Sequence, residues 1–290
     1  MDIIGAGISG LATAYYLARE ESDIEIHIWE KEPFPGGLAG TFSTEDFTVE
    51  KFYHHMFRRD KALQGLIKEL DLEDRLIWRP AATGAYYFRQ PYRLSSPLDL
   101  LRFKPLPIQD RLRLGWMVLH ARRVKDWREL DQVSAKDYIL KVGGEKVYKV
   151  VWEPLFRGKF GPMAESIAAA WLWSKLVDRG GSRSRSGHEV LGYLRGGLGI
   201  LFNEMIDRLR EMGHKVHLDT PIIRLEGTER KIRTLVTDNG SFEADLVISG
   251  VQVPQLVAML PEQTSAYAHS LERINFLGNV CLVLTLNQSL

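Results

Sequence analysis

The stretch that decides the fold is Met1-Asp2-Ile3-Ile4-Gly5-Ala6-Gly7-Ile8-Ser9-Gly10. Ile3 and Ile4 are typical of a buried strand, and Leu11 to Glu20 is typical of a helix rich in Ala and Leu. Between them stands the spacing G-x-G-x-x-G. Its first glycine permits a tight turn, its second lets backbone approach a diphosphate, and its third allows close helix–strand packing. Free N–H groups and the positive dipole at the start of the helix attract anions. We therefore predict that a diphosphate binds at Gly5, Ala6, Gly7, Ile8, Ser9 and Gly10.

Glu30 extends this site. Ile24 to Trp29 alternates between apolar and polar residues, a period that predicts a strand. Glu30 follows that strand, 20 residues after Gly10, where an acidic side chain accepts hydrogen bonds from ribose hydroxyls. Strand, helix and second strand form a βαβ unit, which implies a parallel sheet. This context disfavours the alternative, a glycine turn that serves only packing.

The nucleotide-binding pattern returns near residue 200, with a predicted helix at Leu198 to Met212 and predicted strands at Lys215 to Leu218, Ile232 to Thr237 and Ala244 to Ser249. The part between is richer in Tyr, Arg, Pro and Leu. We predict an α/β fold: a Rossmann-like FAD/NAD(P)-binding domain with an inserted α+β substrate domain. The first domain is expected to be discontinuous, comprising residues 1–75 and 196–265. The second is expected to comprise 76–195 and 266–290 and to be incomplete.

Composition narrows the class of protein. The 290 residues contain 38 Lys and Arg against 37 Asp and Glu, so nothing favours nucleic acid as a partner. A single cysteine, Cys281, excludes an intramolecular disulfide. No apolar run reaches the roughly 18 residues that a membrane-spanning helix needs, and the N-terminus lacks a signal-peptide pattern. We expect a cytoplasmic protein, with membrane association as an open alternative.

The run from Glu30 to Thr41, EKEPFPGGLAGT, resembles a segment of the flavin-containing amine oxidase superfamily in which a Gly-Gly pair follows the ribose-binding acid. That superfamily includes protoporphyrinogen oxidases, phytoene desaturases and amine oxidases. The resemblance implies that the cofactor is FAD and that Gly36 and Gly37 bring backbone near the ribose and diphosphate. It extends the expected contacts to Lys31, Leu38 and Thr41, with Leu38 in place of a frequent arginine.

Four later segments match the superfamily in its own order: Pro154 to Gly161, Tyr193 to Gly199, Asp219 to Leu225 and Ala244 to Ser249. By this resemblance, the main chain of Ile222 exchanges hydrogen bonds with adenine. The family's second flavin-binding turn, a Gly-Asp type near the carboxyl terminus, has no match after Glu262. We therefore expect that the chain is truncated or that the flavin ring is held elsewhere.

The sequence contains no nucleophile motif such as G-x-S-x-G, which agrees with chemistry that is carried by the cofactor. Ile274 to Leu286 matches a strand on which amine oxidases of the superfamily commonly place a lysine, and here that lysine is missing. The resemblance then favours oxidation or desaturation of a large hydrophobic substrate by hydride transfer to flavin, as in protoporphyrinogen oxidase and phytoene desaturase. The expected partner is thus a hydrophobic small-molecule substrate. Open alternatives are a galactopyranose mutase-like flavoenzyme, a non-catalytic lipid-escort protein resembling GDP-dissociation inhibitors, and an NAD-only dehydrogenase.

His55 is the one candidate for a catalytic side chain. Val49 to Phe57 resembles the loop that approaches the isoalloxazine ring, so His55 could contact flavin or substrate. An ordinary paired histidine is the alternative. His54 and His55 are adjacent and lack helical metal-ligand spacing, and we predict no metal site.

The segment Arg79 to Arg128 is strongly basic. Eleven Lys and Arg stand against three Asp, a net charge of about +8. Its predicted helix, within residues 108–125, could lie on an anionic lipid surface or could cover the substrate pocket while its arginines are solvated. A second basic cluster, Arg179 to Gly187, is typical of a solvated loop. Substrate identity, electron acceptor and oligomeric state stay open.

Overall fold

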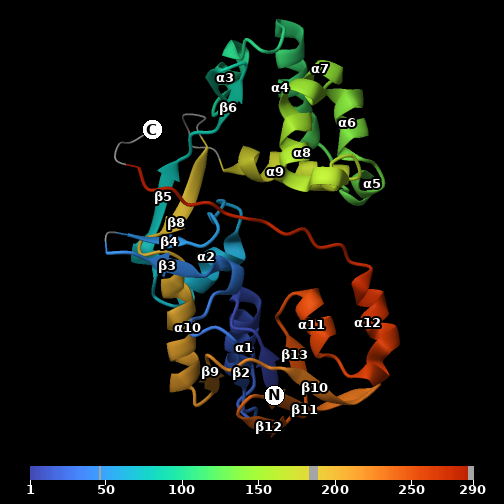
Figure 1. The fold of residues 1–290 in the computed structure, drawn as a ribbon. Helices are drawn as coiled ribbons and strands as arrows, with labels where there is room; N and C mark the ends of the chain where they lie inside the picture. The colour runs from blue at the N-terminus through green and yellow to red at the C-terminus, as the bar shows by residue number, and fades with distance from the viewer. Residues whose placement is uncertain (46, 183–188, 287–290) are drawn as a thin grey trace. The chain divides into compact units, whose positions relative to one another are not determined.

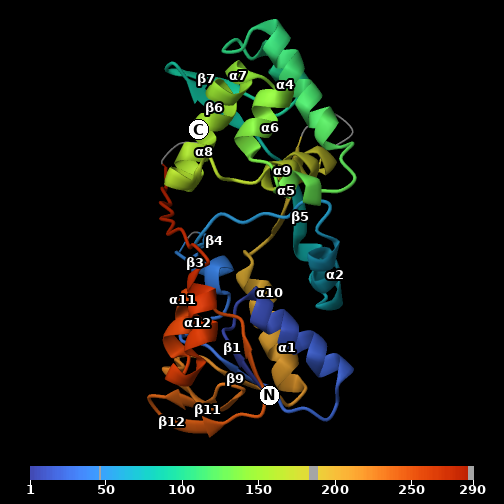
Figure 2. The same ribbon diagram turned by 90° about the vertical axis from the view of Figure 1, so that its right-hand side faces the viewer.

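The computed structural model describes residues 1–45, 47–182 and 189–286 (Figures 1 and 2). Contacts divide the chain into two compact units: Met1–His54, Gly65–Leu76 and Leu194–Leu290 form unit 1, and His55–Gln64 and Ile77–Tyr193 form unit 2. Residues 266–286 thus cluster with unit 1, whereas the sequence analysis places them in the substrate domain. The functional boundaries of the domains stay a prediction. The basic loop segment at 183–188 lies outside the described residues.

Unit 1 is built on a parallel four-stranded sheet of order β13-β1-β2-β9. Its strands are β1 (Asp2–Ile4), β2 (His27–Trp29), β9 (Lys215–His217) and β13 (Val247–Ser249). Ile3 pairs with Ile28 and with Ile248, and the side chains of Ile3 and Ile28 are completely buried. Helices α1 (Ile8–Glu20) and α10 (Gly199–Glu211) contact each other beside this sheet, as Figure 2 shows. The predicted Rossmann-like α/β fold is confirmed.

A second layer packs against the sheet through Ile4 and Trp29. It is an antiparallel sheet of β10 (Arg224–Thr228), β11 (Lys231–Thr237) and β12 (Gly240–Glu243), whose Leu225 and Leu235 share a core with them. Successive residues of a strand point to opposite faces. The side chains of Ile3 and Ile4 therefore pack on opposite faces of the parallel sheet. The remaining elements of unit 1 are η1 (Gly37–Ala39), β3 (Thr41–Ser43), β4 (Thr48–Glu50), η2 (Glu73–Arg75), α11 (Val253–Met259), η5 (Glu262–Thr264) and α12 (Ser265–Glu272).

Three predicted strands differ from the structure. Strand β13 begins at Val247 rather than Ala244. Strand β2 begins at His27 rather than Ile24, because its partner β1 begins only at Asp2, opposite His27. Residues 274–286 were expected to form a strand, but they have neither helix nor strand assignment, and Val280 is 93% exposed. Extended backbone becomes a strand only where a neighbouring strand pairs with it. Within the described residues none does so here.

Unit 2 combines helices with two small sheets. Strand β5 (Leu76–Pro80) pairs with β8 (Val190–Leu194), and β6 (Gly84–Tyr87) pairs with β7 (Gln90–Arg93). Its helices are α3 (Pro97–Arg102), α4 (Ile108–Ala121), α5 (Arg128–Asp131), α6 (Ala135–Val142), α7 (Glu145–Val147), the π-helical turn η3 (Tyr148–Trp152), α8 (Glu153–Phe160), η4 (Gly161–Met163) and α9 (Ala169–Gly181). Helix α2 (Lys61–Glu69) contains the boundary between the units. Phe103, Met117, Ile139, Phe156 and Leu172 form the centre of the core.

Across the described part of the chain, no helix has both the length and the apolar character needed to cross a membrane.

Candidate functional site

The predicted glycine turn lies at the carboxyl end of β1. Gly5 has φ of +101°, a conformation that favours glycine, and its N–H donates to the carbonyl of Trp29 at 2.7 Å. A Cβ built on Gly10 would lie 2.0 Å from the carbonyl oxygen of Gly5. Helix α1 can therefore approach β1 this closely only because residue 10 has no side chain.

The start of α1 is open to an anion. Its N-cap, Gly7, makes no side-chain cap hydrogen bond, and the first turn contains no acidic residue. The first N–H groups of any helix have no intrahelical acceptor, so Ile8, Ser9 and Gly10 offer donors there. A Cβ built on Gly7 meets only the Cα of Gly37, at 4.0 Å. Apart from that contact and the neighbouring residues, no protein atom lies within 4 Å of this Cβ position, so a diphosphate has room to approach the backbone here.

Glu30 is buried beside this turn, with 7% of its surface exposed. Its Oε2 accepts a hydrogen bond from the N–H of Ala6 at 2.8 Å, and its Oε1 accepts one from the N–H of Glu32 at 3.0 Å. The backbone of Glu30 continues the pairing of β2 with β9, because its N–H donates to His217 and its carbonyl accepts from Thr220. The carboxylate is thus fixed in position, and each oxygen keeps a further lone pair for a ribose hydroxyl.

The pair Gly36-Gly37, which follows β2, packs directly against the glycine turn. The N–H of Gly36 donates to the carbonyl of Ala6 at 2.8 Å, and Gly36 forms an isolated parallel bridge with Gly7. Gly36 and Gly37 have φ of +114° and +55°. A Cβ on Gly36 would lie 2.7 Å from the Cα of Gly40, and one on Gly37 would lie 3.4 Å from the Cα of Gly7. Only glycine fits at position 36.

The other predicted contact residues differ in placement. Lys31 is exposed and lies 3.7 Å from the carboxylate of Glu32, and Leu38 is 59% exposed. Thr41 stands on β3, where its Oγ1 faces Gly199 at the start of α10. In the described part of the chain, neither the N–H nor the carbonyl of Ile222 takes part in a backbone hydrogen bond. Both groups are available for the predicted contact with adenine, which stays a prediction.

Sequence reasoning missed Glu50. Its Oε1 accepts a hydrogen bond from the N–H of Leu198, at 2.9 Å, and so caps the start of α10 from strand β4. Gly197 lies against the same hairpin, since a Cβ there would come within 3.0 Å of the Cγ2 of Thr41. The two partners are 148 residues apart, and no local pattern marks such a pair.

His55 belongs to unit 2. Its ring packs edge-on against that of Phe57, with centroids 5.0 Å apart, and it has a further interaction partner. Its proposed contact with flavin or substrate stays a prediction. Among the residues that the structure describes, no group of three or more His, Cys, Asp or Glu side chains is arranged to hold a metal ion.

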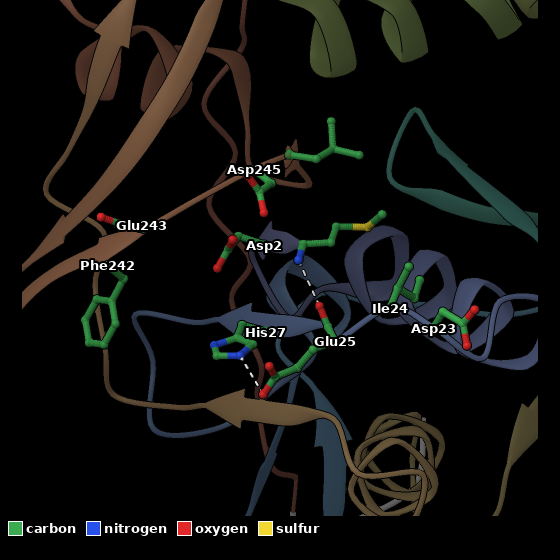
Figure 3. Close-up of a pocket in the computed structure, with 10 residues that line it drawn as sticks. Asp2, Asp23, Ile24, Glu25, His27, Phe242, Glu243 and Asp245 are labelled. Carbon is green, nitrogen blue, oxygen red and sulfur yellow. Dashed lines mark hydrogen bonds and ion pairs between the residues drawn. The ribbon is translucent and has the colours of Figure 1, made fainter.

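A pocket of about 560 Å³ lies at the amino-terminal edge of the parallel sheet (Figure 3). Its polar lining consists of Asp2, Asp23, Glu25, His27, Glu243 and Asp245. Hydrogen bonds from Lys215 and His27 lower the pKa of Glu25. Because the glycine turn follows the carboxyl end of β1, this pocket is separate from the nucleotide site.

The features of the glycine turn fit the adenosine diphosphate half of a dinucleotide. Glycine backbones leave space beside Gly7, the start of α1 offers N–H donors there, and the fixed carboxylate of Glu30 lies beside the turn. Such an arrangement binds phosphates through backbone N–H groups and a ribose through the acid.

Comparisons with known proteins give the family. The family model described as flavin containing amine oxidoreductase matches residues 8–290. A coproporphyrinogen III oxidase of Mycobacterium tuberculosis is 26% identical over 282 residues, covering 89% of this chain and 60% of that protein. A 15-cis-phytoene desaturase of an Oncidium hybrid is 22% identical over 311 residues, covering 97% and 51%.

Solved structures share the fold. A crystal structure from an Exiguobacterium species, named as a candidate protoporphyrinogen oxidase, superposes with a TM-score of 0.67 at 22% identity, covering 90% of this chain and 61% of that one. The chain spans little more than half the length of these relatives. The prediction of FAD is confirmed at the level of the family. The chain belongs to the family of flavin containing amine oxidoreductases.

Proposed function

We propose that the protein is an FAD-dependent oxidoreductase that oxidises a large hydrophobic substrate by hydride transfer to the flavin. One observation carries the proposal: the Gly5–Gly10 turn, the Glu30 carboxylate and the Gly36-Gly37 pair, which are distant in sequence, meet at the start of α1. Family membership supports the same cofactor.

In this proposal the chain binds and orients the cofactor. The N–H groups of Ile8 to Gly10 hold the diphosphate, Glu30 accepts hydrogen bonds from the ribose, and the main chain of Ile222 recognises adenine. FAD, when bound, supplies a two-electron acceptor, while the protein supplies orientation and excludes water. Because Glu30 is held by Ala6 and Glu32 before the cofactor arrives, it loses little freedom on binding.

For the substrate class we favour a porphyrinogen. Coproporphyrinogen III oxidase is the name of the Mycobacterium relative, and the Exiguobacterium structure is named after protoporphyrinogen. The phytoene desaturase makes a polyene the competing class. Each of these molecules has a large hydrophobic framework, in agreement with the expected hydrophobic substrate. A cytoplasmic location stays a prediction.

The first experiment tests the cofactor site. The purified protein is reconstituted with FAD, and its visible spectrum and FAD dissociation constant are measured beside those of Glu30→Ala. Removing a charged acceptor costs about 1.5–3 kcal/mol, so we expect FAD to bind about 10–150-fold more weakly. Glu32→Ala is the matched control, because Glu32 contributes its backbone N–H, not its side chain, to the Glu30 contact.

Equal FAD affinity in Glu30→Ala and wild type would contradict the assignment of the site. A colourless wild-type protein that FAD cannot reconstitute would favour the escort alternative.

The second experiment tests the substrate class. Under anaerobic conditions, the FAD-loaded protein is mixed with coproporphyrinogen III, with protoporphyrinogen or with phytoene, and loss of the flavin absorption is followed. We expect bleaching by the porphyrinogens. Bleaching by phytoene alone would transfer the proposal to desaturation.

A further inference from the structure

Helix α4 carries apolar side chains on two opposite faces. Leu114, Met117 and Ala121 are buried in the core of unit 2. On the other face, which we term the α4 stripe, Ile108, Leu112, Trp116 and Leu119 are 59%, 60%, 47% and 50% exposed. At 3.6 residues per turn the four stripe residues fall within roughly 80° of one another, opposite the buried set. A helix that needed only to cover a core would have polar residues on this face.

The elements beside α4 do not cover the stripe. Figure 1 shows α4 between α3 on one side and α6 and α7 on the other. Helix α3 lies along the edge near Gly115, where a Cβ would be 3.6 Å from Leu100, and α3 adds two exposed leucines, Leu98 and Leu101. The apolar surface therefore extends over two consecutive helices of the basic segment.

The basic residues around the stripe divide into two groups. Arg111, Arg113 and Arg122 are engaged within the unit: Arg111 donates to the carbonyls of Leu101 and Leu106, Arg113 pairs with Asp110 at 3.0 Å, and Arg122 donates to the carbonyl of Gly180. These three arginines stabilise the helix packing.

The second group faces solvent. Arg102, Lys104 and Lys125 are exposed and form no ion pair with another described residue. The guanidinium of Arg123 lies over the ring of Trp116, 5.1 Å from its centroid, at the end of the stripe. Exposed positive charge thus lies at the end of α3, in the segment that joins it to α4, and beyond the end of α4.

We infer that the α4 stripe docks on an anionic lipid surface, with Leu112 and Trp116 entering the interface and Arg102, Lys104, Arg123 and Lys125 meeting lipid phosphates. An in-plane amphipathic helix with Trp and Leu on one face and basic residues beside them binds this way. Basic residues near an anionic leaflet strengthen the binding. This inference rests on unit 2 alone and is independent of the proposed function.

Vesicle sedimentation tests the inference. Wild type is spun with vesicles of phosphatidylcholine alone and with vesicles that also contain phosphatidylglycerol. We expect binding to the anionic vesicles and weaker binding as salt rises. The double variant Leu112→Gln/Trp116→Gln should lower the bound-to-free ratio at least about tenfold, or ~1.4 kcal/mol. Arg102→Gln/Arg123→Gln should lower it by a similar factor on anionic vesicles only.

Leu155→Gln is the matched control, since Leu155 is 49% exposed on α8 of the same unit. It should bind vesicles like wild type, and all variants should keep the wild-type circular dichroism and melting temperature. Absence of wild-type binding, or equal binding by the stripe variant, would overturn the inference. A third outcome would also overturn it: wild type does not bind vesicles but forms a dimer in sedimentation equilibrium, and the stripe variant is a monomer. The α4 stripe would then be an interface between two copies of the chain.

Discussion

The two glycines Gly7 and Gly10 should respond to the same substitution in opposite ways. At Gly7 the backbone has φ of −74° and ψ of 176°, which any residue adopts, and a new Cβ meets only Gly37 Cα at 4.0 Å. Gly7→Ala should therefore leave the unliganded protein as stable as wild type, or stabilise it by about 0.4–1 kcal/mol by restricting the unfolded chain. Its methyl group, however, enters the side of the turn assigned to the diphosphate. We expect FAD to bind at least about tenfold more weakly.

At Gly10 a new Cβ lies 2.0 Å from the oxygen of Gly5, against an ordinary contact of at least 3.4 Å. Helix α1 must shift away from β1 by more than about 1 Å, and overpacking of this kind costs roughly 3 kcal/mol or more. At about 2–4 °C per kcal/mol, the melting temperature should fall by roughly 6–12 °C.

The assay is a thermal melt of both variants without cofactor, followed by FAD titration. Full FAD affinity in Gly7→Ala would refute the close approach of a diphosphate to that backbone. A wild-type melting temperature in Gly10→Ala would refute the packing of α1 on β1.

Two further predictions concern unit 1. Burial, and after it the charges of His27 and Lys215, lowers the pKa of His217 in the folded protein. As the pH falls below about 6.5, this histidine is therefore protonated in the unfolded chain before it is protonated in the folded protein. The free energy of unfolding consequently decreases as the pH falls in this range. In His217→Gln, the free energy of unfolding measured with urea should decrease less steeply below that pH. The slope should differ from that of wild type by at most about 1.4 kcal/mol per pH unit, and by less because the side chain is partly exposed. An equal slope in the variant and wild type would contradict this prediction. Glu50→Ala should lower the unfolding free energy by about 0.5–2 kcal/mol through loss of the cap on α10, whereas Glu50→Gln keeps an acceptor and should lose less; equal losses would contradict the cap.

The parts of the site that sequence could predict are those that local spacing determines. Gly5 and Gly10 are five residues apart, and the contact between them follows from a strand, a turn and a helix. Glu30 reaches the turn because β1 and β2 pair in parallel, which a βαβ unit requires. Each step uses neighbours in sequence or the handedness of one crossover. No tertiary detail is needed.

The parts that sequence could not predict depend on packing between distant segments. Gly36 must be glycine partly because Phe202 of α10 lies 2.8 Å from its missing Cβ, and Glu50 caps the same helix. For α4, hydrophobic periodicity alone cannot separate Leu114 from Leu112, since both belong to apolar rows of one helix. Only the packing of the unit shows that Leu114 is buried and Leu112 is exposed.

These observations indicate why the nucleotide site exists before any ligand binds. Backbone hydrogen bonds fix it on both sides: Gly5 to Trp29, Gly36 to Ala6, and Glu30 to His217 and Thr220. Those of Gly5 and Glu30 extend the pairing of the parallel sheet, so the free energy that forms the sheet also positions the carboxylate, and that of Gly36 accompanies its isolated bridge with Gly7. A cofactor that enters such a site does not have to order the loops that hold it. Substitutions at the turn should consequently change FAD affinity far more than they change the conformation of the unliganded protein, unless, as at Gly10, they force α1 away from β1.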